Sequence, residues 1–407
     1  MSELLFLVHR VPNPPNRGDK IRSHHLLRKL RQLRPVHLVC FADDEADLEA
    51  AEALRPGLAS LHVERRTRSK PAAALRAFAR REPILLPLFG SETMRAHVAR
   101  LLAERPIDAL LAFSIQMAHF VPENLGKTRF VMDFVDMDSA KFAAYAEAAA
   151  WPMRSIWSRE ASLLLDFEHK TAAHADASLF VSDAEAALFR AALDDGAEKV
   201  STLENGVDLT FFNPAAHFDR VEGKGGLIAF TGQMDYRPNI EAVAAFARET
   251  MPLIRAARPD ARFAIVGRNP APEVARLAAL PGVEVIGAVP DIRAWLAAAD
   301  VVVAPLRTAR GVQNKVLEAM AMARPVVASP AAFEGIDAEA GRDLMVADGA
   351  QAESKAIISL LADNARARAF GVAARARVAA RYGWDAALER LPALLGLEEP
   401  VPIEAAA

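Results

Sequence analysis

Short apolar runs alternate with longer amphipathic segments along the whole chain of 407 residues. The runs are rich in Val, Ile, Leu and Phe and are bounded by turn-forming residues, which favours buried strands, whereas the segments between them have the apolar spacing of helices. Strands are predicted at Leu4–His9, Val36–Phe41, Leu61–Glu64, Ile107–Phe113, Arg129–Phe134, Ser178–Ser182, Val200–Glu204, Leu227–Thr231, Arg262–Val266, Val283–Ile286, Val301–Ala304, Pro325–Ala328 and Leu344–Val346. This alternation is typical of parallel sheets with crossover helices, so we expect an α/β fold with two Rossmann-like, doubly wound halves.

The boundary between the halves is predicted within Glu204–Pro214, where Asn205-Gly206 is a turn signal and Asn213-Pro214 stops any element. The predicted organisation is a first domain at 1–204, a linker at 205–225, a second domain at 226–365, helices at 366–395 that pack back toward the first domain, and a tail at 396–407.

Composition narrows the class of protein. Hydrophobic residues make up 52% and charged residues 25%, as in ordinary globular proteins. The single cysteine, Cys40, permits no internal disulfide, and the sequence contains neither a signal peptide nor an apolar run of membrane-spanning length. We therefore expect a cytoplasmic protein. The net charge of −3 argues against nucleic acid as a partner.

Positive charge nevertheless gathers in two runs, Lys20–Arg34 and Arg65–Arg81, and the second contains no acidic residue. Leucines at helical spacing give the first run an apolar stripe. Two interpretations stay open: a surface helix packed on a sheet, or docking on an anionic membrane surface at 20–34 and 65–81, which would make the protein peripheral at the inner face of the membrane.

The second half carries the clearest candidate binding site. Its strands end at glycines such as Gly232 and Gly267, where the absence of Cβ lets a ligand approach the backbone. The loop after Val301–Ala304 runs into a predicted helix whose first turn offers free N–H groups to a diphosphate. Lys315 can add a positive charge, and Glu318, on the same helical face, can accept hydrogen bonds from ribose hydroxyls. A surface ion pair between Lys315 and Glu318 is the alternative.

Several segments, in order and spacing, resemble glycosyltransferase family 4. They are Val181-Ser182 with Glu185, Asn205–Asp208 with Phe212 and Pro214, Phe230–Asn239, Ile265–Gly267, Val285–Asp291, Val303–Leu306 and Gly311–Ala321. Pro12–Asp19, Asp133–Asp136 and Gly311–Lys315 look most similar to the sugar transferases associated with exopolysaccharide loci and the exosortase (PEP-CTERM/XrtA) system. The resemblance implies the GT-B architecture, with two Rossmann-like domains facing across a cleft, and a retaining hexosyltransferase in exopolysaccharide synthesis. The donor would be a UDP- or GDP-linked sugar and the acceptor a saccharide or a lipid-linked molecule, with no cofactor required.

Carried over by position, Glu318 matches the ribose-binding second Glu of the family's E-x7-E motif. The first Glu, which usually contacts the donor sugar, is replaced by Arg310. The family's usual diphosphate-binding Arg and Lys fall near Gln233 and Asn239, so Arg237 is the expected substitute. The predicted donor-binding residues are Gly232, Arg237, Gly267, Arg310, Gly311, Asn314, Lys315 and Glu318.

The acceptor side is predicted in the first half. Arg17, Gly18, Asp19 and Arg22 follow the first strand, where the family places a Gly-rich loop beside the transferred group, although a plain strand-to-helix turn is the alternative. Asp136 and Asp133 follow the fifth strand and are the candidate catalytic residues. Asp136 would orient the acceptor or stabilise positive charge at the reacting sugar, whereas Asp133 has a structural alternative.

Asp136-Met137-Asp138 also spells D-x-D, a metal signature of the other major glycosyltransferase fold, but the Rossmann-like pattern and the lack of a His/Cys cluster predict no metal. Retention can proceed through a covalent carboxylate intermediate or by front-face attack, which the family favours. A NAD-dependent oxidoreductase is disfavoured because no G-x-G-x-x-G follows a strand. A nucleotide-sugar epimerase and a catalytically inactive GT-B scaffold remain as alternatives.

Overall fold

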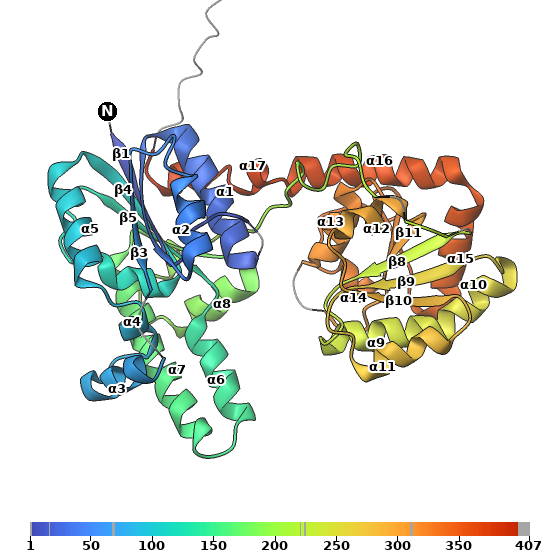
Figure 1. The fold of residues 1–407 in the computed structure, drawn as a ribbon, viewed down its shortest axis with the longest axis horizontal. Helices are drawn as coiled ribbons and strands as arrows, with labels where there is room; N and C mark the ends of the chain where they lie inside the picture. The colour runs from blue at the N-terminus through green and yellow to red at the C-terminus, as the bar shows by residue number, and fades with distance from the viewer. Residues whose placement is uncertain are drawn as a thin grey trace, which may run out of the picture. The chain divides into compact units, whose positions relative to one another are not determined.

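The computed structural model describes residues 2–15, 17–66, 70–219, 221–223, 225–309 and 312–397, and it separates into two compact units (Figure 1). Unit 1 comprises the described residues up to Asn205 and those from Ala387, and unit 2 comprises the described residues of 206–386. Each unit contains one sheet in which every strand pairing is parallel. The predicted fold class, an α/β chain with two doubly wound parallel sheets, is confirmed.

The sheet of unit 1 has the strand order β3-β2-β1-β4-β5-β6-β7. Its strands are β1 (Glu3–Val8), β2 (Val36–Ala42), β3 (Ser60–Arg65), β4 (Ile107–Phe113), β5 (Arg129–Val135), β6 (Ala177–Phe180) and β7 (Val200–Thr202). Its helices are α1 (Gly18–Leu33), α2 (Glu45–Glu52), α3 (Lys70–Arg80), α4 (Leu85–Leu88), α5 (Glu92–Glu104), η1 (Ile115–Phe120), α6 (Asp138–Ala148), α7 (Met153–His174), α8 (Asp183–Ala192) and η2 (Ala197–Lys199). The last short helix of the chain, α18 (Leu391–Leu394), also belongs to unit 1.

The sheet of unit 2 has the order β10-β9-β8-β11-β12-β13. Its strands are β8 (Leu227–Thr231), β9 (Arg262–Val266), β10 (Val283–Gly287), β11 (Val301–Ala304), β12 (Val326–Ala328) and β13 (Met345–Val346). Its helices are α9 (Arg237–Ala245), the π-helical turn η3 (Phe246–Thr250), α10 (Met251–Ala257), α11 (Pro272–Ala275), η4 (Arg276–Ala279), α12 (Ile292–Ala298), α13 (Asn314–Ala321), α14 (Pro330–Phe333), α15 (Gly349–Ala362) and α16 (Asn364–Arg381). The short helix α17 (Trp384–Ala387) ends where the chain passes to unit 1.

The strands are buried because helices cover both faces of each sheet. Every residue of β1, β2, β8 and β11 is buried. These strands therefore read as apolar runs rather than as alternating patterns, apart from the buried polar residues Glu3 in β1 and His37 in β2. The helices contribute one apolar stripe each. On α1 this stripe is formed by Leu26, Leu27, Leu30 and Leu33, all of which lie in the core.

Every predicted strand is present, with ends that differ by at most two residues. The predicted strands at Ile107–Phe113 and Leu227–Thr231 coincide with β4 and β8. At the C-terminal end, α16 packs in unit 2 against α13, since Phe370, Ala374 and Val378 lie in that unit's core. The chain joins unit 1 from Ala387, and Arg129 Nε donates to the carbonyl of Leu394 at 2.7 Å.

Within the described residues, no helix combines the length and the apolar character that crossing a bilayer requires.

Candidate functional site

Each sheet has a point where the strand order reverses, between β1 and β4 in unit 1 and between β8 and β11 in unit 2. Loops that leave two such strands turn toward opposite faces of the sheet and open a crevice at its carboxyl edge, where open α/β sheets bind ligands. The candidate residues of each unit lie at these edges.

Lys315 is positioned in unit 2 by the first turn of α13, which follows β11. Its ammonium donates to Asn239 Oδ1 at 2.5 Å and lies 4.9 Å from the centre of the Phe230 ring. The Asn239 amide in turn donates to the carbonyl of Gln233 at 2.8 Å, in the loop that follows β8. Burial lowers the pKa of Lys315 to about 8. The ammonium is therefore held over the carboxyl end of β8, close to the loop predicted to bind the diphosphate.

Glu318 lies one turn further along α13, and its carboxylate has no hydrogen bond or ion pair with any described residue. Burial raises its pKa to about 7, although the nearby charge of Lys315 opposes this rise. The predicted alternative, a surface ion pair, does not describe this geometry, because Lys315 bonds to Asn239. Glu318 thus offers an unpaired acceptor that a ligand hydroxyl can use.

The two predicted strand-end glycines pack against each other. Gly232 and Gly267 both have a φ of +157°, a backbone conformation that side chains disfavour. A Cβ on Gly267 would lie 1.6 Å from the carbonyl oxygen of Gly232, and a Cβ on Gly232 would lie 2.8 Å from Asn239 Nδ2. Side chains at these positions would displace the loop that holds Asn239 and, through it, Lys315.

The remaining predicted donor residues are less closely placed. Asn314 is the first residue of α13 and is exposed. Arg237 begins α9 and is also exposed, with its Nε 2.6 Å from Glu241 and its guanidinium 3.9 Å from Glu273. The Arg237 side chain must therefore break its interactions with Glu241 and Glu273 before it can bind a phosphate. Arg310 and Gly311 lie outside the described residues.

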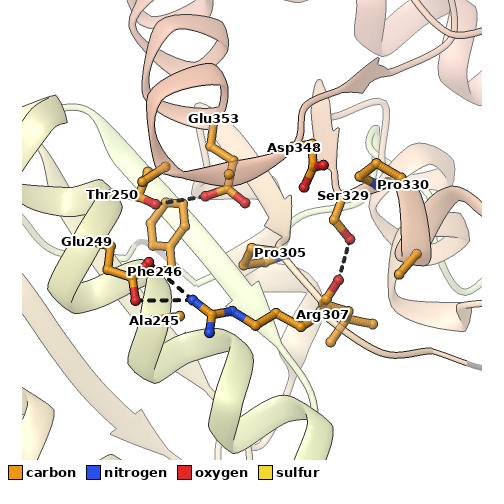
Figure 2. A pocket seen from close by; sticks show the side chains of 14 residues that line it. Ala245, Phe246, Glu249, Thr250, Pro305, Arg307, Ser329, Pro330, Asp348 and Glu353 are labelled. Atoms are coloured by element: carbon orange, nitrogen blue, oxygen red, sulfur yellow. Dashed lines mark hydrogen bonds and ion pairs between the residues drawn. The ribbon is translucent and has the colours of Figure 1, made fainter.

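Unit 2 also contains a cavity of about 550 Å³ at the carboxyl ends of β11 and β12, beside η3 and the start of α15 (Figure 2). Arg307 forms a two-pronged ion pair with Glu249, with both N–O distances 3.1 Å, and the Thr250 hydroxyl donates to Glu353 at 2.7 Å. Burial raises the pKa of Glu353. With Asp348 the cavity presents three carboxylates to one guanidinium, so its field repels a diphosphate. None of the predicted donor residues described by the structure lines it.

Unit 1 has a larger cavity, of about 690 Å³, at the carboxyl ends of β1, β4 and β5. It brings together four of the predicted residues from two distant segments, namely Gly18, Asp19, Arg22 and Asp136. Arg17 lies beside the cavity rather than in its lining and forms an ion pair with Asp19 at 3.0 Å.

The two predicted catalytic carboxylates occupy different environments. Asp136 is exposed and lines the cavity. Asp133 is fully buried, and its Oδ2 accepts from Arg22 Nε at 2.9 Å. Arg22 also donates to Asn205 Oδ1 at 3.0 Å. Asp136 can reach a substrate, whereas Asp133 acts on the site by fixing the Arg22 guanidinium at the cavity wall.

Sequence reasoning missed His9, which directly follows β1 at the reversal of strand order. The ring stacks on Phe113 at 5.6 Å between centroids, and Nε2 lies 3.2 Å from Asp19 Oδ2. Burial lowers the pKa of His9, so the imidazole is neutral at neutral pH. Burial also acts to raise the pKa of Asp19, but hydrogen bonds from His9 and Arg10 outweigh it and lower the pKa. Nε2 also lies 3.2 Å from Arg10 Nη1, and Nδ1 is buried without a hydrogen-bond partner in the described structure. The signal in the sequence was the position of His9 at the end of the first strand.

Two backbone outliers border the same cavity. Ser114 after β4 has a φ of +73°, and Val135 at the end of β5 has a φ of +74°. A β-branched residue in this region is strained, and such strain clusters at functional sites. The turn at Val135 directs the chain so that Asp136 enters the cavity lining.

Within the described residues, His, Cys, Asp and Glu side chains form no group of three or more that could hold a metal ion.

Comparison with known proteins bears on the family and the fold. Residues 225–363 match the family model described as glycosyl transferases group 1. The GDP-mannose-dependent monoacylated alpha-(1-6)-phosphatidylinositol monomannoside mannosyltransferase of Corynebacterium glutamicum is 32% identical over 219 residues, which are 48% of this chain and 56% of that protein. The match thus covers little more than half the length of this curated relative.

Among solved structures, Anabaena Alr3699/HepE in complex with UDP superposes with a TM-score of 0.60 at 16% identity, covering 97% of this chain and all of that one (100%). Sucrose-phosphate synthase from Thermosynechococcus elongatus gives a TM-score of 0.59 at 19% identity, with 97% and 98% of the two chains covered. WaaG, a glycosyltransferase involved in lipopolysaccharide biosynthesis, gives 0.59 at 14% identity over 97% and 100%. Residues 225–363 are therefore a glycosyl transferases group 1 domain, and the chain as a whole has the GT-B fold of two parallel-sheet α/β domains.

Proposed function

We propose that the protein is a retaining, metal-independent glycosyltransferase of family 4. In this proposal it moves a hexose-type sugar from a UDP- or GDP-linked donor to a saccharide or lipid-linked acceptor in exopolysaccharide or other cell-surface glycan synthesis. The observation that carries the proposal is the pair Lys315 and Glu318 on α13 of the group 1 domain, with one buried cation and one unpaired carboxylate beside glycine-lined strand ends. The relatives support this donor class, since one uses GDP-mannose and another binds UDP.

In this scheme Glu318 accepts hydrogen bonds from the two ribose hydroxyls, and Lys315 with the N–H groups of the first turn of α13 neutralises the diphosphate. The acceptor binds the unit 1 cavity, where Asp136 orients it and His9 Nδ1 forms a hydrogen bond with an acceptor hydroxyl.

For front-face transfer, the bond between the anomeric carbon and the diphosphate oxygen breaks while the acceptor oxygen forms its bond on the same face. The proton of the acceptor hydroxyl passes to the leaving phosphate oxygen, so the nucleoside diphosphate leaves and the anomeric configuration is kept. The protein then contributes orientation and charge stabilisation rather than a covalent nucleophile.

The proposal is tested by measuring melting temperature and calorimetric affinity with a panel of UDP-, GDP- and ADP-sugars. One class of nucleotide should raise the melting temperature and bind, and Glu318→Ala should sharply weaken that binding. If no nucleotide sugar binds, or if Glu318→Ala binds as tightly as the natural chain, the assignment of this site is wrong. The anomeric configuration of the product, read by NMR, then tests retention.

A further inference from the structure

The outer face of α3 is apolar, which is the reverse of the usual arrangement on a surface helix. Leu75 is 76% exposed and Phe78 is 48% exposed, while Ala73 and Ala77 are the only buried residues among the side chains of this helix that the structure describes. An isolated exposed leucine is ordinary, but a helix that turns its large apolar side chains outward indicates a surface that binds something apolar.

The hairpin formed by α6 and α7 shows the same feature at its tip. Trp151, in the connection between the two helices, is 82% exposed, Tyr145 is 47% exposed and Met153 is 40% exposed. These three residues and Leu75 and Phe78 of α3 form what we call the apolar patch. It holds most of the large hydrophobic side chains that the described structure exposes.

The two helices that carry the apolar patch, α3 and α6, lie on either side of α7 within unit 1 (Figure 1). The guanidinium of Arg159 lies 4.3 Å from the centre of the Phe78 ring and donates to the carbonyl of Ala77 at 3.0 Å. Two residues earlier, the Trp157 ring lies 6.2 Å from that of Tyr145. The outer face of α3 and the hairpin are therefore fixed to one another through α7.

The apolar patch is continuous with the unit 1 cavity. Phe142 lines the cavity, and its ring lies 5.8 Å from Tyr145 and 5.4 Å from Trp157. On the other side, Leu85 and Leu88 of α4 line the same cavity, and α4 packs against α3. Aromatic side chains thus lead from the cavity wall along the hairpin toward its tip, about 16 Å away for the 11 residues of α6.

Charge and residue type identify the occupant. The described side chains of α3 include Arg76 and Arg80 but no acidic residue, and at the hairpin tip Arg154 and Glu147 are both exposed. Trp and Tyr prefer the boundary between lipid and water, and flanking arginines are attracted to anionic headgroups. By contrast, the basic run on α1 has no apolar face to offer, since its leucines are buried in the core.

We propose that the apolar patch inserts into the surface of an anionic lipid membrane, and that the acceptor is lipid-linked, with its lipid chain lying along Phe142, Tyr145 and Trp157 and its head group in the unit 1 cavity. The part of this inference that concerns the acceptor rests on the proposed glycosyltransferase function, whereas membrane binding does not.

The test uses the full chain and flotation with vesicles of phosphatidylcholine and phosphatidylglycerol. Trp151→Ser should weaken vesicle binding about ten- to a hundredfold. This is the ratio expected when binding loses the transfer of one large apolar side chain from water into the lipid. Because Trp151 is exposed, its replacement should leave the melting temperature unchanged. Leu188→Ser is the matched control, since Leu188 is 47% exposed on α8 of the same unit and lies outside the patch. This variant should bind vesicles as the natural chain does.

Three results would overturn the membrane proposal: a natural chain that does not float with vesicles, a Trp151→Ser variant that binds unchanged, or a Leu188→Ser variant that loses binding equally. Self-association that depends on Trp151, without vesicle binding, would assign the patch to a second copy instead. With a lipid-linked acceptor in vesicles, Trp151→Ser should raise KM and leave kcat unchanged, while a water-soluble acceptor analogue should be used equally well by both proteins. A protein that binds the nucleotide-sugar donor normally but does not bind vesicles would refute the membrane proposal and leave the proposed glycosyltransferase function standing. The two proposals can therefore fail separately.

Discussion

Replacing Glu318 by Gln should stabilise the protein at alkaline pH and at the same time weaken nucleotide binding. The carboxylate sits on α13 without a partner among the described residues, and burial raises its pKa from the ordinary 4.5 to about 7. The folded state therefore holds this proton more tightly than the unfolded chain does. The charge costs nothing below about pH 4.5, its cost grows as the pH rises, and the full cost is reached above about pH 7.

The size of the effect follows from that rise. A change from 4.5 to about 7 corresponds to at most about 3 kcal/mol, and the half-buried carboxylate keeps some hydration, which makes the measured value smaller. Gln has nearly the same shape and no charge, so the variant should recover up to this amount at about pH 9 and nothing at about pH 4. The variant also loses the attraction between Glu318 and the Lys315 ammonium, but this loss is small at about pH 9. The pKa of Lys315 is lowered to about 8, so its side chain is largely neutral at that pH.

Binding should change in the opposite direction. If Glu318 binds the ribose as we propose, the variant replaces two charge-assisted hydrogen bonds by weaker ones, which should reduce nucleotide affinity by about ten- to a hundredfold. The assay is thermal unfolding over a pH series, with calorimetric titration of the nucleotide that the donor panel identifies. Glu334→Gln, on an exposed residue of the same unit, is the control and should change neither quantity. A Glu318→Gln variant that melts no higher than the natural chain at alkaline pH would refute the buried-charge argument, and unchanged affinity would refute the ribose assignment.

Three further substitutions separate the roles of other residues. Asp133→Asn leaves the buried Arg22 without its counter-charge and should cost about 3–5 kcal/mol, seen as a fall in the melting temperature. Asp136→Asn alters an exposed side chain, so it should leave melting and nucleotide affinity unchanged while sugar transfer falls at least about a hundredfold; normal turnover would exclude a catalytic role. Gly267→Ala places a methyl group 1.6 Å from the Gly232 carbonyl, so both stability and nucleotide affinity should decrease, and a fully active variant would contradict the packing of these loops.

The strands could be predicted because their environment is uniform. A parallel strand covered on both faces needs apolar residues at nearly every position, and β8 and β11 carry that requirement in their own sequence. The placement of Lys315 and Glu318 could be predicted for a similar reason, since both lie within one turn of a helix that follows a buried strand. Local sequence is sufficient when a site belongs to one element.

Other features depend on neighbours that are distant in the chain. Glu241, four residues after Arg237 on the same helix, is a local partner of its guanidinium, but Glu273 comes from a distant segment that the sequence near Arg237 does not indicate. The outward face of α3 could not be recognised either, because its spacing of Leu75 and Phe78 is equally compatible with a buried stripe. The elements that a helix packs against decide which of its faces is buried. The helix α3 packs against α4 and α7 rather than against the sheet.

The two candidate sites differ in how much of their charge is already neutralised. In unit 1, Arg22 is paired with Asp133, and Arg10 is paired with Asp19 at 2.7 Å. These ion pairs fix the charged side chains of the cavity wall before any ligand binds. In unit 2, Lys315 has only a neutral amide as its hydrogen-bond acceptor, and Glu318 has no partner within the described residues. Both unit 2 groups are desolvated without full compensation, which the shifted pKa values express. A nucleoside diphosphate would supply negative charge to Lys315 and hydroxyl donors to Glu318. Part of its binding free energy would then come from compensating the desolvation of these two groups, which destabilises the empty protein. That is why the substitution at Glu318 should stabilise the empty protein and weaken the complex.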